Sequence, residues 1–297
     1  MPRIERRLIR DAARAALLTS LFISPLMSTS AQAQAPARET YADLPGVHLW
    51  YRDTGGSGVP VVLLHATTGS SRVWEYQLPV FTENGFRVIA YDRRGFGRSV
   101  IDPAGAQPDT GADDLQALMN HLGIDRFHLA GTAGGAFVAL DFALSFPERL
   151  RSLVVASSIG GVQDEDFVAM GRRLRPSPQF EALPPEVREV GPSYRAANPD
   201  GTRRWVELER ISRPPGPLAP AQTMRNRLTL ALLERIAVPT LLMTGDADLF
   251  APPPVQKLFA ARIKNAESVI VPEAGHSLYW EQPEIFNRTV LGFIRKH

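Results

Sequence analysis

The sequence contains no cysteine, which excludes a disulfide-stapled scaffold and any metal site built on thiolates. It also lacks a marked excess of one charge, because 33 Lys and Arg residues stand against 31 Asp and Glu residues. The net positive charge lies in residues 1–33, which carry five Arg against one Glu and one Asp, so we expect no basic surface for nucleic acid in the rest of the chain. Hydrophobic residues make up 44% of the 297 residues, enough for a globular core.

Residues 1–33 have the features of an export signal. An arginine-rich start is followed by a mostly apolar stretch, and Ala31-Gln32-Ala33 fits the small-residue pattern of a cleavage site. Arg6-Arg7 resembles a twin-arginine motif, but paired arginines also suit an ordinary Sec signal, and both routes stay open. No later stretch is long and apolar enough to span a bilayer. We therefore expect a bacterial protein that is cut after Ala33 and is soluble, without a membrane contact, in the periplasm or outside the cell.

After this leader, short apolar runs alternate with longer amphipathic stretches. Buried strands are predicted at residues 61–64, 86–91, 127–130, 153–156, 240–243 and 268–271. Helices are predicted at residues 73–84, 111–122, 135–146, 255–261 and 283–295, and an antiparallel edge strand at residues 47–53. Continuous apolar strands suit a parallel sheet that is covered on both faces. The sequence thus predicts an α/β fold with a mostly parallel central sheet and helices on both sides.

One interval interrupts this alternation. Residues 160–238 contain no strand-like run, are dense in proline, and fit helices at residues 164–174, 185–190, 201–211 and 224–236. The interval begins at the carboxyl end of a strand, where α/β folds bind ligands. We therefore divide the chain into an export signal (residues 1–33), a core (residues 34–159 and 239–297) and a helical lid (residues 160–238). A peripheral insertion with its own small core is the alternative to a lid.

Five short motifs follow the predicted strands in a fixed order. They are His65-Ala66-Thr67-Thr68-Gly69, Asp92-Arg93-Arg94-Gly95-Phe96-Gly97-Arg98-Ser99, Gly131-Thr132-Ala133-Gly134-Gly135, Gly245-Asp246-Ala247-Asp248 and Gly275-His276-Ser277. Each motif alone is a weak signal. In this order, each beside a predicted strand, the set resembles the single-domain, lid-bearing α/β-hydrolase family over nearly the whole chain after the leader. Because a fold does not fix chemistry, the role of each residue needs its own argument.

The resemblance implies a catalytic base and an oxyanion site. His276 matches the base, and Asp248 matches the carboxylate that orients it, with Asp246 as a less favoured rival. The backbone N–H groups of Gly134 and Thr67 match the pair of donors that binds an oxyanion. The hydroxyl of Thr68, next along the chain, can add a further donor there.

The third motif matches the tight strand-to-helix turn known as the nucleophile elbow, and its tip carries Ala133 where the family has a nucleophile. A methyl group cannot attack a carbonyl, so no acyl-enzyme can form at this position. A serine replaced on purpose and a natural absence are both open explanations, and the retained leader favours the natural one. A displaced nucleophile is a minor alternative, because its candidates do not stand on an elbow; they are Thr67, Thr68, Ser157 and Ser158.

Three functions fit these residues. The first is hydrolysis of an ester or lactone of a small organic substrate by direct attack of water. The second is base chemistry by His276 and Asp248 without an acyl-enzyme, as in a lyase, an isomerase or a cofactor-free oxygenase. The third is binding of a small ligand without catalysis.

Phe250 and Trp205 are the expected substrate contacts. No phosphate loop, dinucleotide-binding glycine pattern or metal-ligand spacing is found, so no cofactor or metal is expected. The oligomeric state cannot be inferred.

Overall fold

A computed structural model describes residues 38–102, 110–177, 179–213 and 222–297. The predicted export signal, residues 1–33, lies outside these residues. Among the described helices, none is long and apolar enough to cross a membrane.

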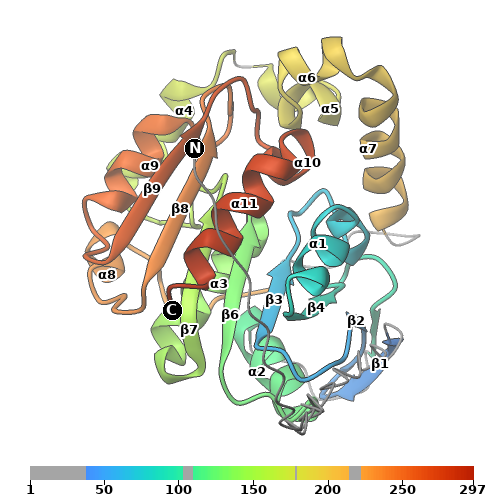
Figure 1. The fold of residues 1–297 in the computed structure, drawn as a ribbon. Coiled ribbons are helices and arrows are strands. Elements are labelled where there is room, and N and C mark those ends of the chain that lie inside the picture. The colour runs from blue at the N-terminus through green and yellow to red at the C-terminus, as the bar shows by residue number, and fades with distance from the viewer. Residues whose placement is uncertain (1–37, 103–109, 178, 214–221) are drawn as a thin grey trace, which may run out of the picture. The chain divides into compact units, whose positions relative to one another are not determined.

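The described strands form one nine-stranded sheet in the order β1-β2-β4-β3-β6-β7-β8-β9, with β5 beside β2 (Figure 1). Their bounds are β1 (Arg38–Leu44), β2 (Val47–Asp53), β3 (Pro60–Leu64), β4 (Arg87–Tyr91), β5 (Val100–Ile101), β6 (Phe127–Thr132), β7 (Leu150–Ala156), β8 (Thr240–Gly245) and β9 (Ala266–Val271). The strands β4, β3, β6, β7, β8 and β9 pair in parallel, whereas β1, β2 and β5 pair antiparallel. The six parallel strands are those predicted from the apolar runs, so the predicted fold class is confirmed. The strand at residues 268–271 is not buried as predicted, because β9 lies at the edge of the sheet and only its last residue, Val271, is buried.

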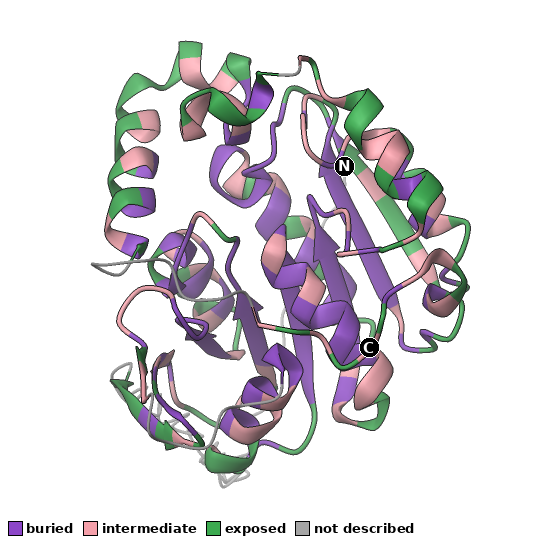
Figure 2. Ribbon diagram, turned by 180° about the vertical axis from the view of Figure 1, so that it is seen from behind, coloured by how far each residue is buried: buried purple, intermediate pink, exposed green. Residues whose placement is uncertain are grey.

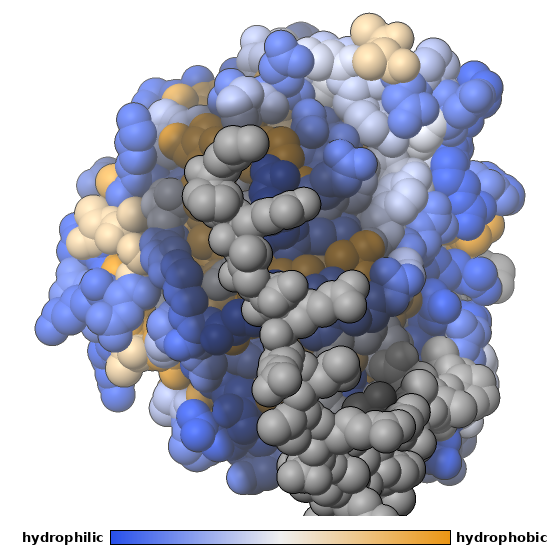
Figure 3. Space-filling model, viewed as in Figure 1, coloured by the Kyte–Doolittle hydropathy of each residue, from blue (hydrophilic) through white to orange (hydrophobic). Residues whose placement is uncertain are grey.

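Successive side chains of the strands enter two separate hydrophobic clusters, as the alternation of a pleated strand requires. In β3, Val62 and Leu64 belong to one cluster, and Val61 and Leu63 belong to the other. Outside residues 160–238, the helices that contribute to the clusters are α1 (Gln77–Glu83), α2 (Gly111–His121), α3 (Gly134–Ser145), α9 (Pro253–Ala260), α10 (Leu278–Glu281) and α11 (Pro283–Ile294). Burial is nearly continuous along the central strands (Figure 2). The surface seen in Figure 3 is mainly hydrophilic.

The prediction of an edge strand at residues 47–53 is right in direction and wrong in position. β2 is antiparallel, but β1 pairs along its whole length and lies outside it. β1 joins the sheet through its backbone and leaves most of its side chains exposed, so no buried apolar pattern marks it in the sequence.

The interval between β7 and β8 is helical wherever it has regular structure among the described residues. It contains α4 (Glu165–Leu174), α5 (Pro185–Glu189), α6 (Pro192–Ala197), α7 (Pro199–Ser212) and α8 (Leu230–Leu233), with a short 3₁₀ turn at Phe180–Ala182. Helices α5, α6 and α7 lie together beside α10 (Figure 1). The helix predicted at residues 224–236 is wrong except at α8. The carboxylate of Asp141 binds the backbone N–H groups of Arg225 and Asn226 there, a long-range contact that local sequence does not announce.

Candidate active site

The strand-to-helix turn between β6 and α3 has the strained backbone of an elbow. Ala133 lies at its tip with φ 48° and ψ −117°, a region that residues with a side chain rarely adopt. An added Cβ at Gly135 would collide with the carbonyl oxygens of Leu64 and His65, and one at Gly131 would lie 2.7 Å from the carbonyl oxygen of Gly135. These glycines let the helix start directly against β3, so the turn survives although its tip carries only a methyl group.

His276 and Asp248 meet across the carboxyl ends of β8 and β9. The Nδ1 atom of His276 lies 2.9 Å from both carboxylate oxygens of Asp248. The carboxylate is itself fixed, because its Oδ1 accepts the backbone N–H groups of Phe250 and Ala251 at 2.8 Å. The rival, Asp246, accepts the backbone N–H of Glu273 instead. The geometry therefore brings together the preferred pair.

His276 differs from an ordinary buried histidine in its protonation state. Burial alone would lower the pKa of His276, but the charge and hydrogen bond of Asp248, aided by Glu189 and Glu281, raise that pKa to about 9. Burial would raise the pKa of Asp248, yet the contact with His276 and two backbone N–H groups leaves that pKa below its usual value. At neutral pH the pair is an imidazolium beside a carboxylate.

The predicted oxyanion donors lie side by side. Gly134 is the first residue of α3, so its N–H has no acceptor within the helix. A Cβ on Gly134 would lie 3.5 Å from the backbone nitrogen of Thr67 and 3.6 Å from Nη2 of Arg93. Burial lowers the pKa of Arg93 to about 10, which leaves it a cation at neutral pH. Its Nε and Nη2 have no acceptor among the described residues, so an unneutralised positive charge stands beside the oxyanion loop.

His65, in the same loop, is a structural residue. Its Nε2 accepts the backbone N–H of Arg93 at 3.0 Å, and its Nδ1 lies 2.6 Å from the carbonyl oxygen of Ala66. Burial, with the charge of Arg93, holds the pKa of His65 well below its usual value. A neutral ring with both nitrogens engaged has no free site for proton transfer.

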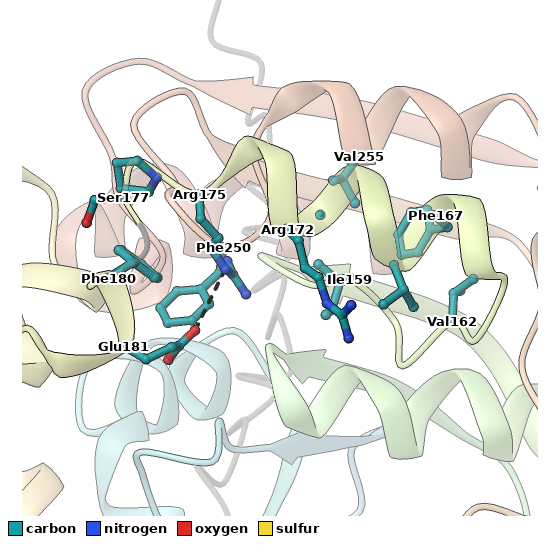
Figure 4. A pocket seen from close by; sticks show the side chains of 13 residues that line it. Ile159, Val162, Phe167, Arg172, Arg175, Ser177, Phe180, Glu181, Phe250 and Val255 are labelled. Carbon is teal, nitrogen blue, oxygen red and sulfur yellow. Dashed lines mark ion pairs between the residues drawn. The ribbon is translucent and has the colours of Figure 1, made fainter.

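Two adjoining cavities open beside these groups. A small one, about 110 Å³, is lined by Ala133, Gly134, Thr67, Thr68 and His276, among others. A larger one, about 790 Å³, lies under α4 and has mainly apolar walls. Ile159 and Phe250 line both cavities. Figure 4 shows the larger cavity, with Phe167 and Val255 toward one end, Phe180 and Phe250 toward the other, and the side chain of Arg172 between them.

Of the two predicted substrate contacts, Phe250 lines both cavities and Trp205 lines neither. The ring of Phe250 lies 4.8 Å, centroid to centroid, from the ring of His276. Trp205 is a correction: it lines neither cavity, is 3% exposed, and donates from Nε1 to the hydroxyl of Ser277. Trp205 lies on the side of α7 that packs against the hydrophobic core, so its role here is packing and not contact with a substrate.

The alternative nucleophiles have different surroundings. The hydroxyl of Ser158 is occupied, because it donates to the carbonyl oxygen of Ala133. Ser157 lines the small cavity with a buried, unpartnered hydroxyl and has a positive φ of 47°. Among the described residues, no hydroxyl hydrogen-bonds to the ring of His276.

One residue of this site has no signal in the sequence. Glu189, the last residue of α5, lines the small cavity and is 7% exposed. Its carboxylate oxygen lies 4.0 Å from Nε2 of His276, and the nearby side chain of Thr68 acts to lower the pKa of Glu189. The predicted third oxyanion donor, Thr68, thus lies close to a carboxylate. A single glutamate in a polar helix looks like a solvated residue, and only the tertiary fold reveals its burial.

The comparisons with known proteins agree with this architecture. The model of the alpha/beta hydrolase family matches residues 61–289. The chain is 30% identical to a 2-hydroxy-6-oxononadienedioate/2-hydroxy-6-oxononatrienedioate hydrolase of Burkholderia vietnamiensis, over 83% of this chain and 90% of that protein. A thermophilic esterase from Thermogutta terrifontis, solved with malate bound, superposes with a TM-score of 0.72 at 30% identity, covering 88% of this chain and 99% of that one.

A dihydrolipoyllysine-residue acetyltransferase component of the acetoin cleaving system from Pseudomonas putida is also 30% identical, over 90% of this chain and 71% of that protein. Similarity at this level thus extends to proteins with different named activities. The shared fold therefore does not fix the reaction, and the side chains of the site have to decide it.

Proposed function

The chain belongs to the alpha/beta hydrolase family, and from this premise we propose that it hydrolyses an ester or lactone of a small organic substrate by direct attack of water. The observation that carries this proposal is that His276, held by Asp248, faces a cavity whose elbow tip is Ala133. The resemblance to an esterase and to a hydrolase supports the reaction class. No acyl-enzyme forms at position 133, because a methyl group has no atom that can attack.

The scissile carbonyl lies over Ala133 in this proposal, with its oxygen toward the N–H groups of Thr67 and Gly134. Those donors stabilise the negative charge that develops on the oxygen when water attacks the carbon. The charge of Arg93 beside the loop favours the same oxyanion. His276 and the polar groups around it take up the proton of the attacking water and supply a proton to the leaving group. Such a site retains roughly 10³- to 10⁴-fold catalysis over water even where a triad member is missing.

The larger cavity suggests which substrates to try first. Its apolar walls suit a hydrocarbon or aromatic group, and Phe250 lies between that group and the reacting carbonyl. Arg175 is paired with Glu181 (Figure 4), whereas Arg172, which also lines the cavity, has no ion pair with the described residues. We propose that an acidic substrate group meets Arg172. The dioate named for the Burkholderia vietnamiensis relative is in keeping with this.

Residues 160–238 act as a lid in this proposal, and residues 1–33 as an export signal that is cut after Ala33. A fusion of residues 1–33 to a reporter enzyme that is active only outside the cytoplasm tests the second point. Substitution of Arg6 and Arg7 by lysine blocks export of the fusion if the signal uses the twin-arginine route and leaves it intact if the signal uses Sec.

The decisive experiment compares the protein with its Ala133→Ser variant on 4-nitrophenyl esters and lactones. We expect steady turnover without an initial burst for the parent, and a burst that matches the enzyme concentration for Ala133→Ser, because serine at the tip can be acylated. Ala136→Ser, one turn further into α3, is the matched control and should show no burst.

Other outcomes would reject direct hydrolysis. Tight ligand binding without turnover would make the protein a silent binder. Solvent hydrogen exchange at a carbon acid without ester cleavage would point to a lyase or an isomerase. A burst in the parent that is lost in Ser157→Ala would identify a displaced nucleophile.

A further inference from the structure

Glu189 is the acidic residue among the described lining of the small cavity, and it approaches His276 at Nε2, whereas Asp248 binds Nδ1. Glu189 reaches this cavity from the end of α5, and its own backbone carbonyl accepts the N–H of Ser277 at 2.8 Å. This hydrogen bond ties the carboxylate's segment to the residue that follows His276. Oε2 of Glu189 lies 4.0 Å from Nε2 of His276, the nitrogen that a serine at the elbow tip would otherwise engage.

We propose that Glu189 is a further catalytic residue, whose carboxylate takes the proton from the attacking water while His276 gives its Nε2 proton to the leaving group. This assignment rests on the proposed hydrolysis and names the base and the acid within it. The 4.0 Å separation is too long for a direct hydrogen bond. The two groups can therefore act on different atoms of the substrate, one on the water and the other on the leaving oxygen.

The reaction balances without any further reagent. In the first step the water oxygen bonds to the acyl carbon, its proton passes to Glu189, and the carbonyl electrons move to the oxyanion held by Thr67 and Gly134. In the second step the C–O bond to the leaving group breaks, and His276 protonates the departing alkoxide. Glu189 then releases its proton to the solvent and His276 takes one up from it, which restores both groups, and the products are one carboxylic acid and one alcohol, or one hydroxy acid from a lactone.

The surrounding charges support this division of roles. Because the pKa of His276 is raised to about 9, its ring is protonated at neutral pH and has no lone pair with which to accept a proton. Burial raises the pKa of Glu189 above its usual value, although the charge of His276 opposes this, and a base is most effective when its pKa approaches the working pH.

The other titratable groups around the pair are accounted for. Arg188, on the same helix, favours the ionised form of Glu189, and Asp248 opposes it. From α10, Glu281 contributes to the raised pKa of His276. Burial raises the pKa of Glu281 itself to about 7, although its carboxylate accepts the backbone N–H groups of Gly191, Gly275 and Ser277. Burial raises the pKa of Tyr279 further above its usual value, so this side chain stays neutral throughout. None of these groups faces the cavity as Glu189 does.

The test measures kcat, KM and the pH profile of Glu189→Gln. We expect kcat to fall roughly 10²- to 10⁴-fold with little change in KM, because the amide fills the same space and cannot accept the proton. The parent should show a bell-shaped profile, active when Glu189 is ionised and lost as pH rises through the pKa of His276 near 9. Glu186→Gln removes a carboxylate from the same helix outside the cavity and should match the parent.

Two further variants separate chemistry from structure. Glu189→Ala should regain activity when formate is added, since a small carboxylate can occupy the vacated space, and Glu189→Asp should retain part of the activity. Circular dichroism checks that each variant is folded. Neither rescue is expected if Glu189 only stabilises the fold.

The outcomes separate this inference from the proposed function. Turnover that needs His276 but is unchanged in Glu189→Gln overturns the inference and leaves hydrolysis standing. A parent rate that rises through about pH 9 and stays high also overturns it, because His276 is then the base. A parent that cleaves no ester or lactone removes the proposed function, and the inference falls with it.

Discussion

Two histidines are almost equally buried in this fold and differ in charge. His276 is 7% exposed and His128, in β6, is 2% exposed. The pKa of His276 is raised to about 9, whereas burial, aided by Arg151 and His297, lowers the pKa of His128 to about 4. His128 hydrogen-bonds to the hydroxyl of Ser152 at 2.8 Å, and His276 contacts carboxylates on both ring nitrogens.

The difference shows that burial by itself makes a histidine neutral. A ring within the sheet loses hydration and, without an acidic neighbour, gives up its proton. A ring at the carboxyl ends of the strands meets side chains from separate loops, and their charges outweigh the same desolvation. The reactive histidine is therefore defined by what the loops and the insertion bring to it.

Substitution of His276 and of His128 should give the largest difference in activity between the two histidines. We expect His276→Ala to lower kcat on an alkyl ester by roughly 10³- to 10⁴-fold, since a poor leaving group needs a proton donor. The loss on a 4-nitrophenyl ester should be smaller, because that leaving group departs without one. His128→Gln should keep the parent's rates. Equal losses on both esters would argue against His276 as the acid.

Removing the carboxylate on Nδ1 should move His276 toward the behaviour of His128. In Asp248→Asn the imidazolium loses its principal stabilising charge, so its pKa falls and the alkaline limb of the pH profile shifts to lower pH. We expect kcat at neutral pH to fall by roughly 10³-fold, less than the roughly 10⁴-fold loss that the same change causes in a catalytic triad. Asp246→Asn, two residues earlier, is the control. An unchanged alkaline limb in Asp248→Asn would assign that limb to another group.

Part of this site could be predicted from the sequence, and part could not. The glycines of the elbow were predictable because a tight strand-to-helix turn has no room for side chains there. The pair of His276 and Asp248 and the oxyanion loop were predicted from the resemblance of five short motifs to the α/β-hydrolase family. Glu189 was not predictable, since its burial comes from packing of the insertion against the core. The same reason explains Trp205, an expected substrate contact that the fold turns into the core.

His128 and His276 should change the pH dependence of the free energy of unfolding in opposite directions. This is the smallest of the expected effects. For His128 the folded pKa, about 4, lies below the unfolded value of 6.5. The unfolded chain binds more protons between these values, so stability is full above the upper one and is lost as pH falls toward the lower one. For His276 the folded pKa is the higher, so stability is full below 6.5 and is lost as pH rises toward 9.

Urea unfolding of the parent and of His128→Gln checks the acid window. Between about pH 7 and pH 5 the parent should lose about 1–2 kcal/mol more unfolding free energy than the variant, because only the parent carries the depressed histidine. His48→Gln, at an exposed histidine, should follow the parent. Parallel curves for the parent and His128→Gln would mean that His128 titrates alike in both states, and the contrast between the two buried rings would then no longer rest on their charge.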